Sequence, residues 1–510
     1  MSIDVTTPDE DAAKLAALGY KQELHRGMSA FSNFAVSFSI ISVLAGCITT
    51  YYLAMDGGGP MAINLGWPLC SIMVLCVAMA MGEICSVYPT SGGLYFWAGR
   101  LARTHKREWA WYTGWFNFMG EVGVTASVDY GAAVTWMAFA SEVWGTEVTL
   151  KKTFALFLIF VLLHGLLNTF GVNIVKILSS VSAWWHLAGV GFIVVVLAFV
   201  PDHHQSASYV FTHTNNGLGF ADGLFSTPVY AFFIGLLMAQ YTLTGYDASA
   251  HMAEETHDAT RQAPKGIVRS VWVSAIAGWI LLIAVTAAIQ NFDKERASAT
   301  GLPPAQIFLD AAGRSLGLTL LVICGVAQFF CGMACVTSNS RMSYAFSRDG
   351  ALPGSRIWAK VNPRTGTPTN SIWLCVTCSV ALTLPALWNA TAFFAVVSVA
   401  VIGLYIAYTV PIYLRRRNRE FTQGDWHLGR WSAPIGWIAV AWVAFIVVMF
   451  MLPQYSPGTI GDKTFNYAPV AVVGVLLFAS VMWLVTGRKH FMRDVPEGHD
   501  TRPAAELLED

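Results

Sequence analysis

The strongest constraint on the fold of this chain is a series of long apolar runs that recur through most of its 510 residues. A helix needs about 20 apolar residues to cross the ~30 Å hydrocarbon core of a bilayer. Lipid offers no partners to backbone N–H and C=O groups, so such runs cross as helices. The runs lie near residues 31–55, 64–88, 110–142, 153–170, 173–200, 226–250, 267–290, 317–345, 370–389, 391–413, 433–452 and 467–487. The sequence therefore predicts an all-α integral membrane protein with twelve transmembrane helices.

Composition supports this class and argues against several others. Only 12% of the residues are charged, whereas a soluble domain has about 25%. The formal net charge is zero, which argues against nucleic-acid binding, because that function requires a basic surface. The sequence contains no phosphate-binding loop, nucleophile elbow or paired-histidine zinc motif. We therefore expect neither an enzyme nor an ATP-driven pump, and we predict no cofactor and no bound metal.

The distribution of Lys and Arg predicts the orientation in the membrane. Cytoplasmic connections carry an excess of basic residues. If the N-terminus lies inside, only six of the 31 basic residues fall in outside loops: Lys151, Lys152, Lys294, Arg296, Arg314 and Lys463. Both termini are therefore expected in the cytoplasm. Residues 1–30 and 488–510 are predicted to be cytoplasmic tails around a membrane domain at 31–487.

Two of the predicted helices are expected to be interrupted. The first span carries small and hydroxyl residues from Ser42 to Thr50, and the sixth breaks its apolar run at residues 244–247 (TGYD). Irregular backbone at membrane depth survives only where it lines a cavity, and matching interruptions in two halves of a chain indicate a transporter's central site. The halves would be two five-helix repeats, at about 31–200 and 226–413. The alternative is that Gly46 and Gly245 only allow close helix packing.

Ionisable residues within the spans supply candidates for the site. After the sixth-span break, Asp247, His251, Glu254 and Glu255 recur at spacings that place them on one face of a resumed half-helix. A charged face in the membrane faces protein or water, not lipid. Asp247 is predicted to serve the substrate site; the alternative is that it only caps that half-helix. The third span adds Glu121 and Asp129, and the fifth adds His186. The fourth contains His164, which we interpret as a lone structural hydrogen-bond donor rather than a proton carrier.

Three motifs occur together, in order and with plausible spacing. They are EICSVYPTSGGLY at residues 83–95, GYDASAHMAEET at 245–256 followed by RQAPKGI at 261–267, and SRMSYAFSRDGALP at 340–353. This set resembles the amino acid–polyamine–organocation permeases, and within them the amino acid/choline branch that includes GABA permeases. The resemblance implies five-plus-five inverted repeats with broken first and sixth helices and two extra helices at 433–487.

The resemblance also implies where a substrate would bind. Its carboxylate would rest on backbone N–H groups of the first break, at Ser42, Val43, Leu44, Ala45 and Gly46. Its amine would face the sixth break, at Thr244, Gly245, Tyr246 and Asp247, and an aromatic gate at Tyr241 or Tyr246 would cover it. The first break contains fewer glycines than in many relatives, which leaves room for cationic substrates. His186 aligns with a lysine that replaces a sodium ion in relatives.

Coupling and gating residues follow from these positions. His186, Glu121 and Asp129 are the candidates for proton coupling, and a structural hydrogen bond is the alternative role of His186. We hypothesise that Glu254, Glu255, Arg261 and Lys265 form part of an inner gate, with ion pairs among them that break when the carrier opens inward; the alternative is a solvated loop.

The expected function is secondary transport across the plasma membrane. The substrate would be an amino acid or a related amine such as GABA, moved with protons. The alternatives are an organic-cation carrier for choline, ethanolamine or polyamines, and an amino acid exchanger. A channel and a membrane-embedded enzyme remain two further classes. The sequence leaves the substrate, the coupling ion and the oligomeric state open.

Overall fold

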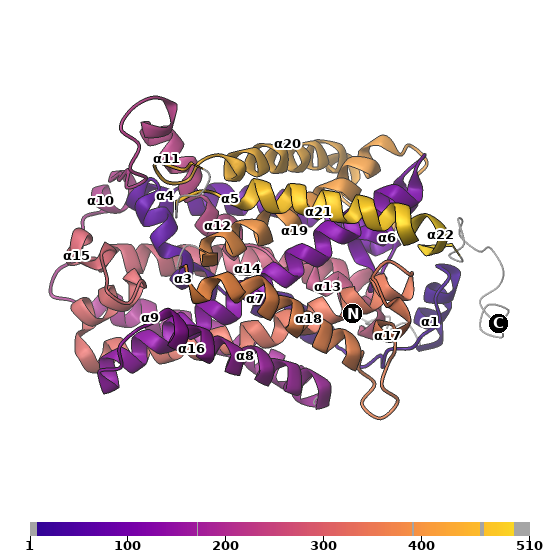
Figure 1. The fold of residues 1–510 in the computed structure, drawn as a ribbon, viewed down its shortest axis with the longest axis horizontal. Coiled ribbons are helices and arrows are strands. Elements are labelled where there is room, and N and C mark those ends of the chain that lie inside the picture. Colours follow the sequence, from indigo (N-terminus) through magenta and orange to yellow (C-terminus); the bar gives the residue numbers. More distant parts are fainter. Residues whose placement is uncertain (1–7, 171, 390–391, 460–463, 494–510) are drawn as a thin grey trace.

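A bundle of roughly parallel helices forms the protein in the computed structural model (Figure 1), which describes residues 8–170, 172–389, 392–459 and 464–493. These residues contain no β-strand. The helices that run along the bundle are α2 (Ala30–Ile41), α3 (Val43–Asp56), α5 (Gly66–Val87), α7 (Lys106–Trp144), α8 (Leu150–Phe170), α9 (Val172–Phe199), α11 (Pro228–Gly235), α12 (Leu237–Thr242), α14 (Ala259–Ala287), α16 (Pro303–Arg348), α18 (Thr369–Thr383), α19 (Ala392–Arg417), α20 (Ser432–Met451) and α21 (Ala468–Met482).

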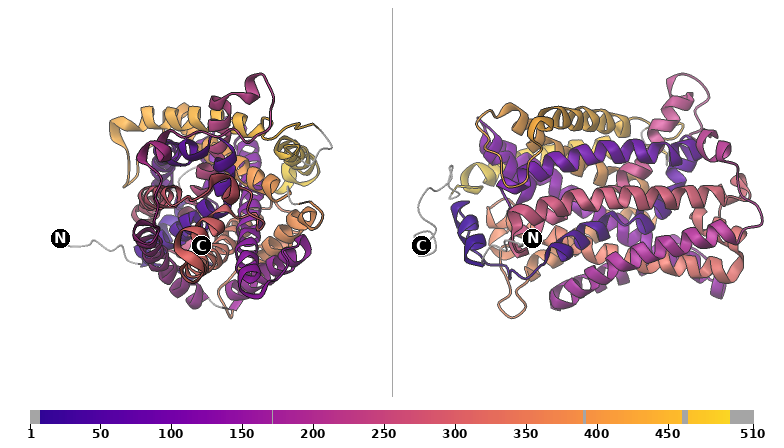
Figure 2. Two further views of the ribbon diagram at one scale, coloured as in Figure 1. Left: turned by 90° about the vertical axis from the view of Figure 1, so that its left-hand side faces the viewer. Right: turned by 180° about the vertical axis from the view of Figure 1, so that it is seen from behind.

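Shorter helices lie at the two ends of the bundle and between its long elements. They are α1 (Pro8–Ala17), α4 (Gly59–Asn64), α6 (Gly93–Leu101), α10 (Ala207–Thr212), α13 (Ala248–His251), α15 (Phe292–Arg296), α17 (Ser355–Trp358) and α22 (Arg488–His490). Figure 1 shows α10 and α15 at one end and α1, α17 and α22 at the other. We refer to these as the α15 end and the α1 end; the view from behind in Figure 2 shows the same division.

The predicted membrane class is confirmed, whereas the count of twelve spans goes beyond what helix length and composition show. Ten helical stretches of the described chain are long and apolar enough to cross a membrane. Two predicted spans are not among them. One is α7, with 39 residues. The other is the sixth, whose apolar helical part is the shorter stretch Pro228–Thr242.

The long helix α7 packs against both α16 and α19 in the interior of the bundle. Small residues make the contact with α19 close. A Cβ on Gly123 would lie 3.0 Å from the Cα of Ala400, and one on Gly120 would lie 2.8 Å from the backbone N of Leu404. Helices in a membrane associate through such close packing of small residues. The polar side chains of α7 are thereby fixed within the bundle.

The first predicted break is real but shorter than expected. The helix is interrupted only at Ser42, which has φ 29° and ψ 82°. The Ser42 side chain accepts a hydrogen bond from the N–H of Ala45 and caps α3, so the helix resumes at once. Val43, Leu44, Ala45 and Gly46 are therefore helical, which corrects the broad unwound stretch inferred from the sequence.

The second predicted break lies where the sequence placed it. Residues 243–247 separate α12 from α13, and Gly245 has φ +86°. The resumed helix is only one turn long, at Ala248–His251, and a 3₁₀ turn follows at Ala253–Glu255. Asp247 precedes α13, but its side chain makes no capping hydrogen bond. The capping role considered for Asp247 therefore does not describe this structure.

Gly245→Ala is expected to destabilise the protein. The backbone there is left-handed, which costs a residue with a Cβ about 1–2 kcal/mol, and the added Cβ would collide with Cγ2 of Ile40. The thermal midpoint of the purified protein in detergent should fall. Gly474→Ala is the matched control, because its Cβ would meet no atom within 4 Å. Equal midpoints for the two variants would contradict the assigned backbone at Gly245.

Candidate functional site

The two helix breaks face each other in the centre of the bundle. Helices α3 and α12 pack together, and a Cβ on Gly46 would lie 2.9 Å from the Cα of Thr242. On the α1 side of the breaks, the Ser37 hydroxyl donates to the carbonyl of Tyr246 at 3.0 Å, and the N–H of Ser249 donates to the Ser37 hydroxyl at 2.9 Å. The broken helices are thus joined directly through polar groups.

Two tyrosines of α19 satisfy the backbone of the sixth break. The Tyr405 hydroxyl donates to the carbonyl of Leu243 at 2.8 Å. The Tyr408 hydroxyl accepts from the N–H of Gly245 at 3.2 Å and donates to Oδ1 of Asp247 at 2.7 Å. Buried backbone groups require such partners. These bonds hold the unwound backbone in place and fix the Asp247 carboxylate.

A cluster of three ionisable side chains lies beside the sixth break: Glu121 from α7, Asp247 from the break and His251 from α13. We call it the central cluster. The His251 Nε2 lies 3.3 Å from Asp247 Oδ2 and 3.8 Å from Glu121 Oε1. The Ser338 hydroxyl donates to Glu121 Oε1 at 3.1 Å, and Asn117 donates to Asp247 at 3.4 Å. All three members of the cluster are buried.

The tautomer of His251 follows from its other nitrogen. Nδ1 lies 2.8 Å from the carbonyl oxygen of Ser91. A carbonyl only accepts hydrogen bonds, so Nδ1 carries a proton. The nitrogen that gains or loses a proton is therefore Nε2, which faces the two carboxylates. The cluster can share protons among three groups at one point.

The same three residues are also the group in the described chain that could hold a metal ion. Each offers one ligand atom, and these atoms lie within 4.8 Å of one another. A zinc site uses His nitrogen and carboxylate oxygen at about 2.0–2.2 Å. The side chains already have hydrogen-bond partners in Ser91, Ser338 and Tyr408. The arrangement is suited to protons without a change of geometry.

His186 lies at the first break rather than in the central cluster. Its Nε2 is 2.6 Å from the Ser42 hydroxyl, and its Nδ1 is 2.7 Å from the carbonyl of Ser182. The carbonyl fixes the proton on Nδ1, so Ser42 donates to Nε2 of the neutral ring. Both ring nitrogens are satisfied without a second proton. His186 thereby supports the residue at which the first span is interrupted.

Asp129, the third candidate for coupling, forms a separate pair with His164 of α8. Asp129 Oδ1 lies 2.9 Å from His164 Nδ1, and both side chains are fully buried. Gly332 of α16 leaves the space for this pair, since a Cβ there would lie 2.6 Å from His164 Cε1. The structure therefore separates Asp129 from Glu121, although both belong to α7.

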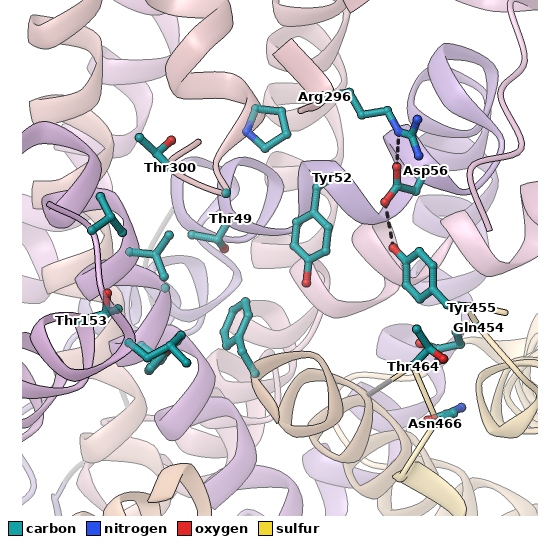
Figure 3. Close-up of a pocket in the computed structure, with 18 of the residues that line it drawn as sticks. Thr49, Tyr52, Asp56, Thr153, Arg296, Thr300, Gln454, Tyr455, Thr464 and Asn466 are labelled. Carbon is teal, nitrogen blue, oxygen red and sulfur yellow. Dashed lines mark hydrogen bonds and ion pairs between the residues drawn. The ribbon is translucent and has the colours of Figure 1, made fainter. Parts of the chain in front are cut away.

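A cavity of about 470 Å³ opens on the α15 side of the breaks. Tyr130 and Gly131 of α7 contribute to its walls, as do Thr49 and Tyr52 of α3 (Figure 3). Closer to the breaks, the Tyr241 and Ser127 hydroxyls are 2.7 Å apart and join α12 to α7. Tyr241 thus lies between this cavity and the central cluster.

The α1 side of the site is closed by two buried ion pairs. Arg348 contacts Glu254 through both of its terminal nitrogens, at 3.0 and 3.1 Å, and Arg341 Nε lies 2.8 Å from Glu255 Oε1. Arg261 instead pairs with Asp425 at 3.6 Å, on a half-exposed surface. Lys265 forms no ion pair with a described residue. The acidic residues of the predicted gate are thus paired with α16, not with the predicted basic partners.

Residues 22–28, which we call the strap, cover these ion pairs. The N–H of Met28 donates to the carbonyl of Glu255 at 2.8 Å, and Arg26 donates to the carbonyl of Thr256 at 2.6 Å. Just before the strap, the Tyr20 hydroxyl donates to Asp349 at 2.7 Å. Burial raises the pKa of the Asp349 carboxyl above its ordinary value, and the Arg348 guanidinium opposes that rise. The α1 end is closed by an interlocked polar layer.

Few N–H groups of the first break are left for a ligand. The N–H of Ser42 bonds to the carbonyl of Phe38, and those of Ala45 and Gly46 bond to the carbonyl of Ser42. Val43 and Leu44 occupy the first turn of α3, where N–H groups have no intrahelical acceptor.

In the sixth break, the Thr244 hydroxyl donates to the carbonyl of Tyr241, and the Tyr246 ring packs 4.9 Å from that of Tyr408.

Sequence reasoning did not identify the partners that complete the site. Tyr405 and Tyr408 are three residues apart in an apolar span, and this spacing places both on one helix face. Arg341 and Arg348 stand in the motif at 340–353, but their partners lie 86 and 94 residues earlier. The spacing of the two tyrosines could have indicated their shared role. No pattern in the sequence indicated the partners of the two arginines.

Comparison with known proteins identifies the family. A family model described as amino acid permease matches residues 28–478. The chain is 41% identical to the amino-acid permease BAT1 of Arabidopsis thaliana, over 96% of each chain. It is 41% identical to the BAT1 homolog of rice, Oryza sativa subsp. japonica, over 95% of each. An uncharacterised amino-acid permease of Schizosaccharomyces pombe is 31% identical, over 96% of this chain and 90% of its own.

These matches confirm the predicted resemblance at the level of the superfamily. They extend over the broken helices, the central cluster and both ends of the bundle. The relatives are transporters rather than enzymes, in agreement with the absence of catalytic motifs. The chain belongs to the amino acid permease family, and it is a multi-pass membrane transporter.

Proposed function

We propose that this permease carries a small amino acid or an amino-acid-like amine such as GABA across the plasma membrane together with a proton. The observation that carries the proposal is the central cluster, where Glu121, Asp247 and His251 meet at the break of the sixth span. Charged groups at membrane depth are costly and mark substrate or proton pathways. The alternating-access mechanism requires such a site between two closures.

The proposed topology has twelve spans, with α7 and the interrupted sixth span added to the ten apolar stretches. Residues 31–200 and 226–413 would be inverted repeats, each beginning with a broken helix, and α20 and α21 would be the extra helices. Support comes from the position of the breaks, at Ser42 and at residues 243–247. The α1 end would face the cytoplasm, because basic residues concentrate in its connections.

The proposed substrate pose uses both breaks. The carboxylate would approach the first turn of α3, where Val43 and Leu44 offer N–H groups and the helix dipole favours an anion. The amine would approach the Asp247 carboxylate beside Gly245. Tyr241 would act as the gate on the α15 side, since its hydroxyl bond to Ser127 closes that side.

Charge balance favours symport at this cluster. With a neutral His251 ring, the carboxylates of Glu121 and Asp247 carry two negative charges in a buried site. Burying such charges without partners is strongly unfavourable. One substrate ammonium and one proton bring the cluster to neutrality together, and neither does so alone. The carrier that holds one substrate and one proton is therefore the loaded form that can rearrange.

The runner-up readings are a carrier of choline, ethanolamine or polyamines and an amino acid exchanger. The relatives' names favour amino acids over organic cations. Exchange would follow if only the substrate-loaded carrier could rearrange and the empty carrier could not. A channel is disfavoured by the closure on both sides of the breaks.

Uptake into proteoliposomes tests the proposal. A panel of amino acids, GABA, choline and polyamines is offered in turn, with an inward pH gradient applied or collapsed. We expect saturable uptake and counterflow of at least one amino acid, stimulated by the gradient. Uptake of choline or polyamines alone would support the cation carrier. Counterflow without net uptake would support the exchanger.

The central cluster and His186 can be distinguished by their variants. Asp247→Asn should abolish both uptake and counterflow, because the amine loses its carboxylate. Glu121→Gln should keep counterflow but lose the stimulation by the pH gradient. His186→Gln, which retains a donor and an acceptor for Ser182 and Ser42, should keep that stimulation. Glu147→Gln, an exposed carboxylate-to-amide change, is the control for expression and assay.

The opposite pattern would assign coupling to the first break. If the gradient still drives uptake in Glu121→Gln but not in His186→Gln, the proton group is His186.

The same preparations are assayed with a chelator and with added Zn²⁺. Loss of uptake on chelation would show that the cluster requires a metal instead.

We further propose that the pairs Glu254–Arg348 and Glu255–Arg341 form the inner gate, covered by the strap. Removing one partner of a buried pair leaves a charge unpaired and costs about 3–5 kcal/mol. This cost applies only to the inward-closed arrangement, in which the charges are buried. Breaking a pair therefore favours opening toward the α1 end.

Arg341→Gln is expected to expose Ser179, a buried residue beside Glu255 and Arg341. In a Ser179→Cys background, a water-soluble maleimide should label the site faster once Arg341 is replaced. Arg261→Gln is the matched control, because its partner Asp425 lies outside the gate. Faster labelling with Arg261→Gln but not with Arg341→Gln would contradict this assignment and would support the gate pairs predicted from the sequence, which include Arg261.

A further inference from the structure

We propose that the cavity at the α15 end is a second binding site, which holds an amino acid zwitterion with an apolar side chain before it reaches the breaks. The proposal rests on the proposed function, because it takes the α15 end as the side from which substrate enters. It adds a site that the central cluster does not include. We call this cavity the outer site.

The outer site is large enough and separate enough to hold its own ligand. Its volume is about 470 Å³, and binding pockets for small molecules span roughly 300–1,000 Å³. Thr49, in its wall, is seven residues beyond Ser42 on α3, which corresponds to about 10 Å along the helix axis. The Tyr241–Ser127 hydrogen bond lies between the two sites. A ligand in the cavity would not touch the central cluster.

One wall of the outer site contains charges of both signs. Figure 3 shows Asp56 between Arg296 and Tyr455, with interactions to both. Arg296 uses its Nε for Asp56, and its two terminal nitrogens form no hydrogen bond with a described residue. Planar guanidinium N–H groups bind carboxylates in pairs. Arg296 can therefore receive a ligand carboxylate without giving up Asp56.

Unsatisfied acceptors in the same wall suit an ammonium group. Gln454 lines the cavity and is 1% exposed, and its Oε1 has no hydrogen-bond partner. A buried acceptor left without a donor is destabilising, and buried polar groups are nearly always paired. The Tyr52 hydroxyl forms no hydrogen bond with a described residue either, and Asp56 adds a carboxylate. A ligand N–H group would supply the missing donor.

The rest of the cavity is mainly apolar. Val134 of α7, Leu150 of α8 and Phe393 of α19 are among its lining residues. An apolar side chain would be removed from water there. The combination of a guanidinium, free acceptors and an apolar wall matches a zwitterionic amino acid better than an amine or a carboxylate alone.

Cysteine protection tests the outer site directly. Thr300 lines the cavity and is half-buried, so Thr300→Cys should react with a water-soluble methanethiosulfonate. The nine native thiols are free, and all but the half-buried Cys378 are buried, which keeps the background low. L-leucine should slow the reaction roughly tenfold at about ten times its Kd. Isopentylamine and 4-methylpentanoate, which each lack one charge, should not.

A second experiment disables the central cluster with Asp247→Asn and asks whether the outer site still binds. In a Thr300→Cys, Asp247→Asn protein, L-leucine should still protect, because the outer site does not use Asp247. Adding Gln454→Leu or Val134→Phe should abolish protection, the first by removing the free acceptor and the second by filling the apolar part. Ser208→Cys, exposed outside the cavity, is the control that should not be protected.

Two results would overturn the outer site. One is protection that disappears with Asp247→Asn, since the ligand would then act from the centre. The other is no protection by L-leucine in a protein that takes up amino acids. Failure of the whole amino acid panel in the uptake assay is a different result, which rejects the proposed function itself.

Discussion

The unwound backbone of the sixth span is the feature on which the rest of this structure depends. In a membrane, an N–H or C=O group released from a helix has no water to bind. Tyr405 and Tyr408 supply the missing partners, and Tyr408 also binds the Asp247 carboxylate. The same side chain that makes the break possible thus orients the charge beside it. Tyr408 therefore both satisfies the unwound backbone and positions the Asp247 carboxylate.

Charges are buried at two levels of the bundle, and each level is balanced in a different way. Near the α1 end, Glu254 and Glu255 meet fixed cations in Arg348 and Arg341. In the centre, Glu121 and Asp247 face His251, a ring that carries at most one positive charge, so the cluster lacks one or two positive charges. The first arrangement is self-sufficient, whereas the second leaves negative charge that a bound cation could balance. Under the proposed function, this difference separates a closure from a binding site.

The sequence predicted the features that depend on local spacing. The membrane class, the two interruptions and the proximity of Asp247 and His251, four residues apart, all follow from periodicity and from the cost of irregular backbone in lipid. The length of the first break was overestimated, because Ser42 caps α3 and the helix resumes directly. Hydroxyl residues in a span indicate a possible break, but only the cap geometry sets its extent.

Features that depend on packing between distant segments could not be predicted in this way. His164 was interpreted as a lone structural histidine, yet it pairs with Asp129 across two helices. The acidic residues at 254 and 255 have arginines close by in sequence, but their partners come from α16. Helix rotation and register decide such pairings, and a single sequence contains neither. The candidate site was therefore predicted in outline, without its hydrogen-bond network.

The strap has a consequence for how the chain is made. Its residues leave the ribosome before the first span, but their partners, the carbonyls of Glu255 and Thr256, follow more than 220 positions later. Until the sixth span has been inserted, the strap lacks these partners beside a growing set of helices. Long-range contacts of this kind form last during synthesis. The seal at the α1 end is therefore a late event in biogenesis, and a nascent carrier remains unsealed there until both broken helices are in place.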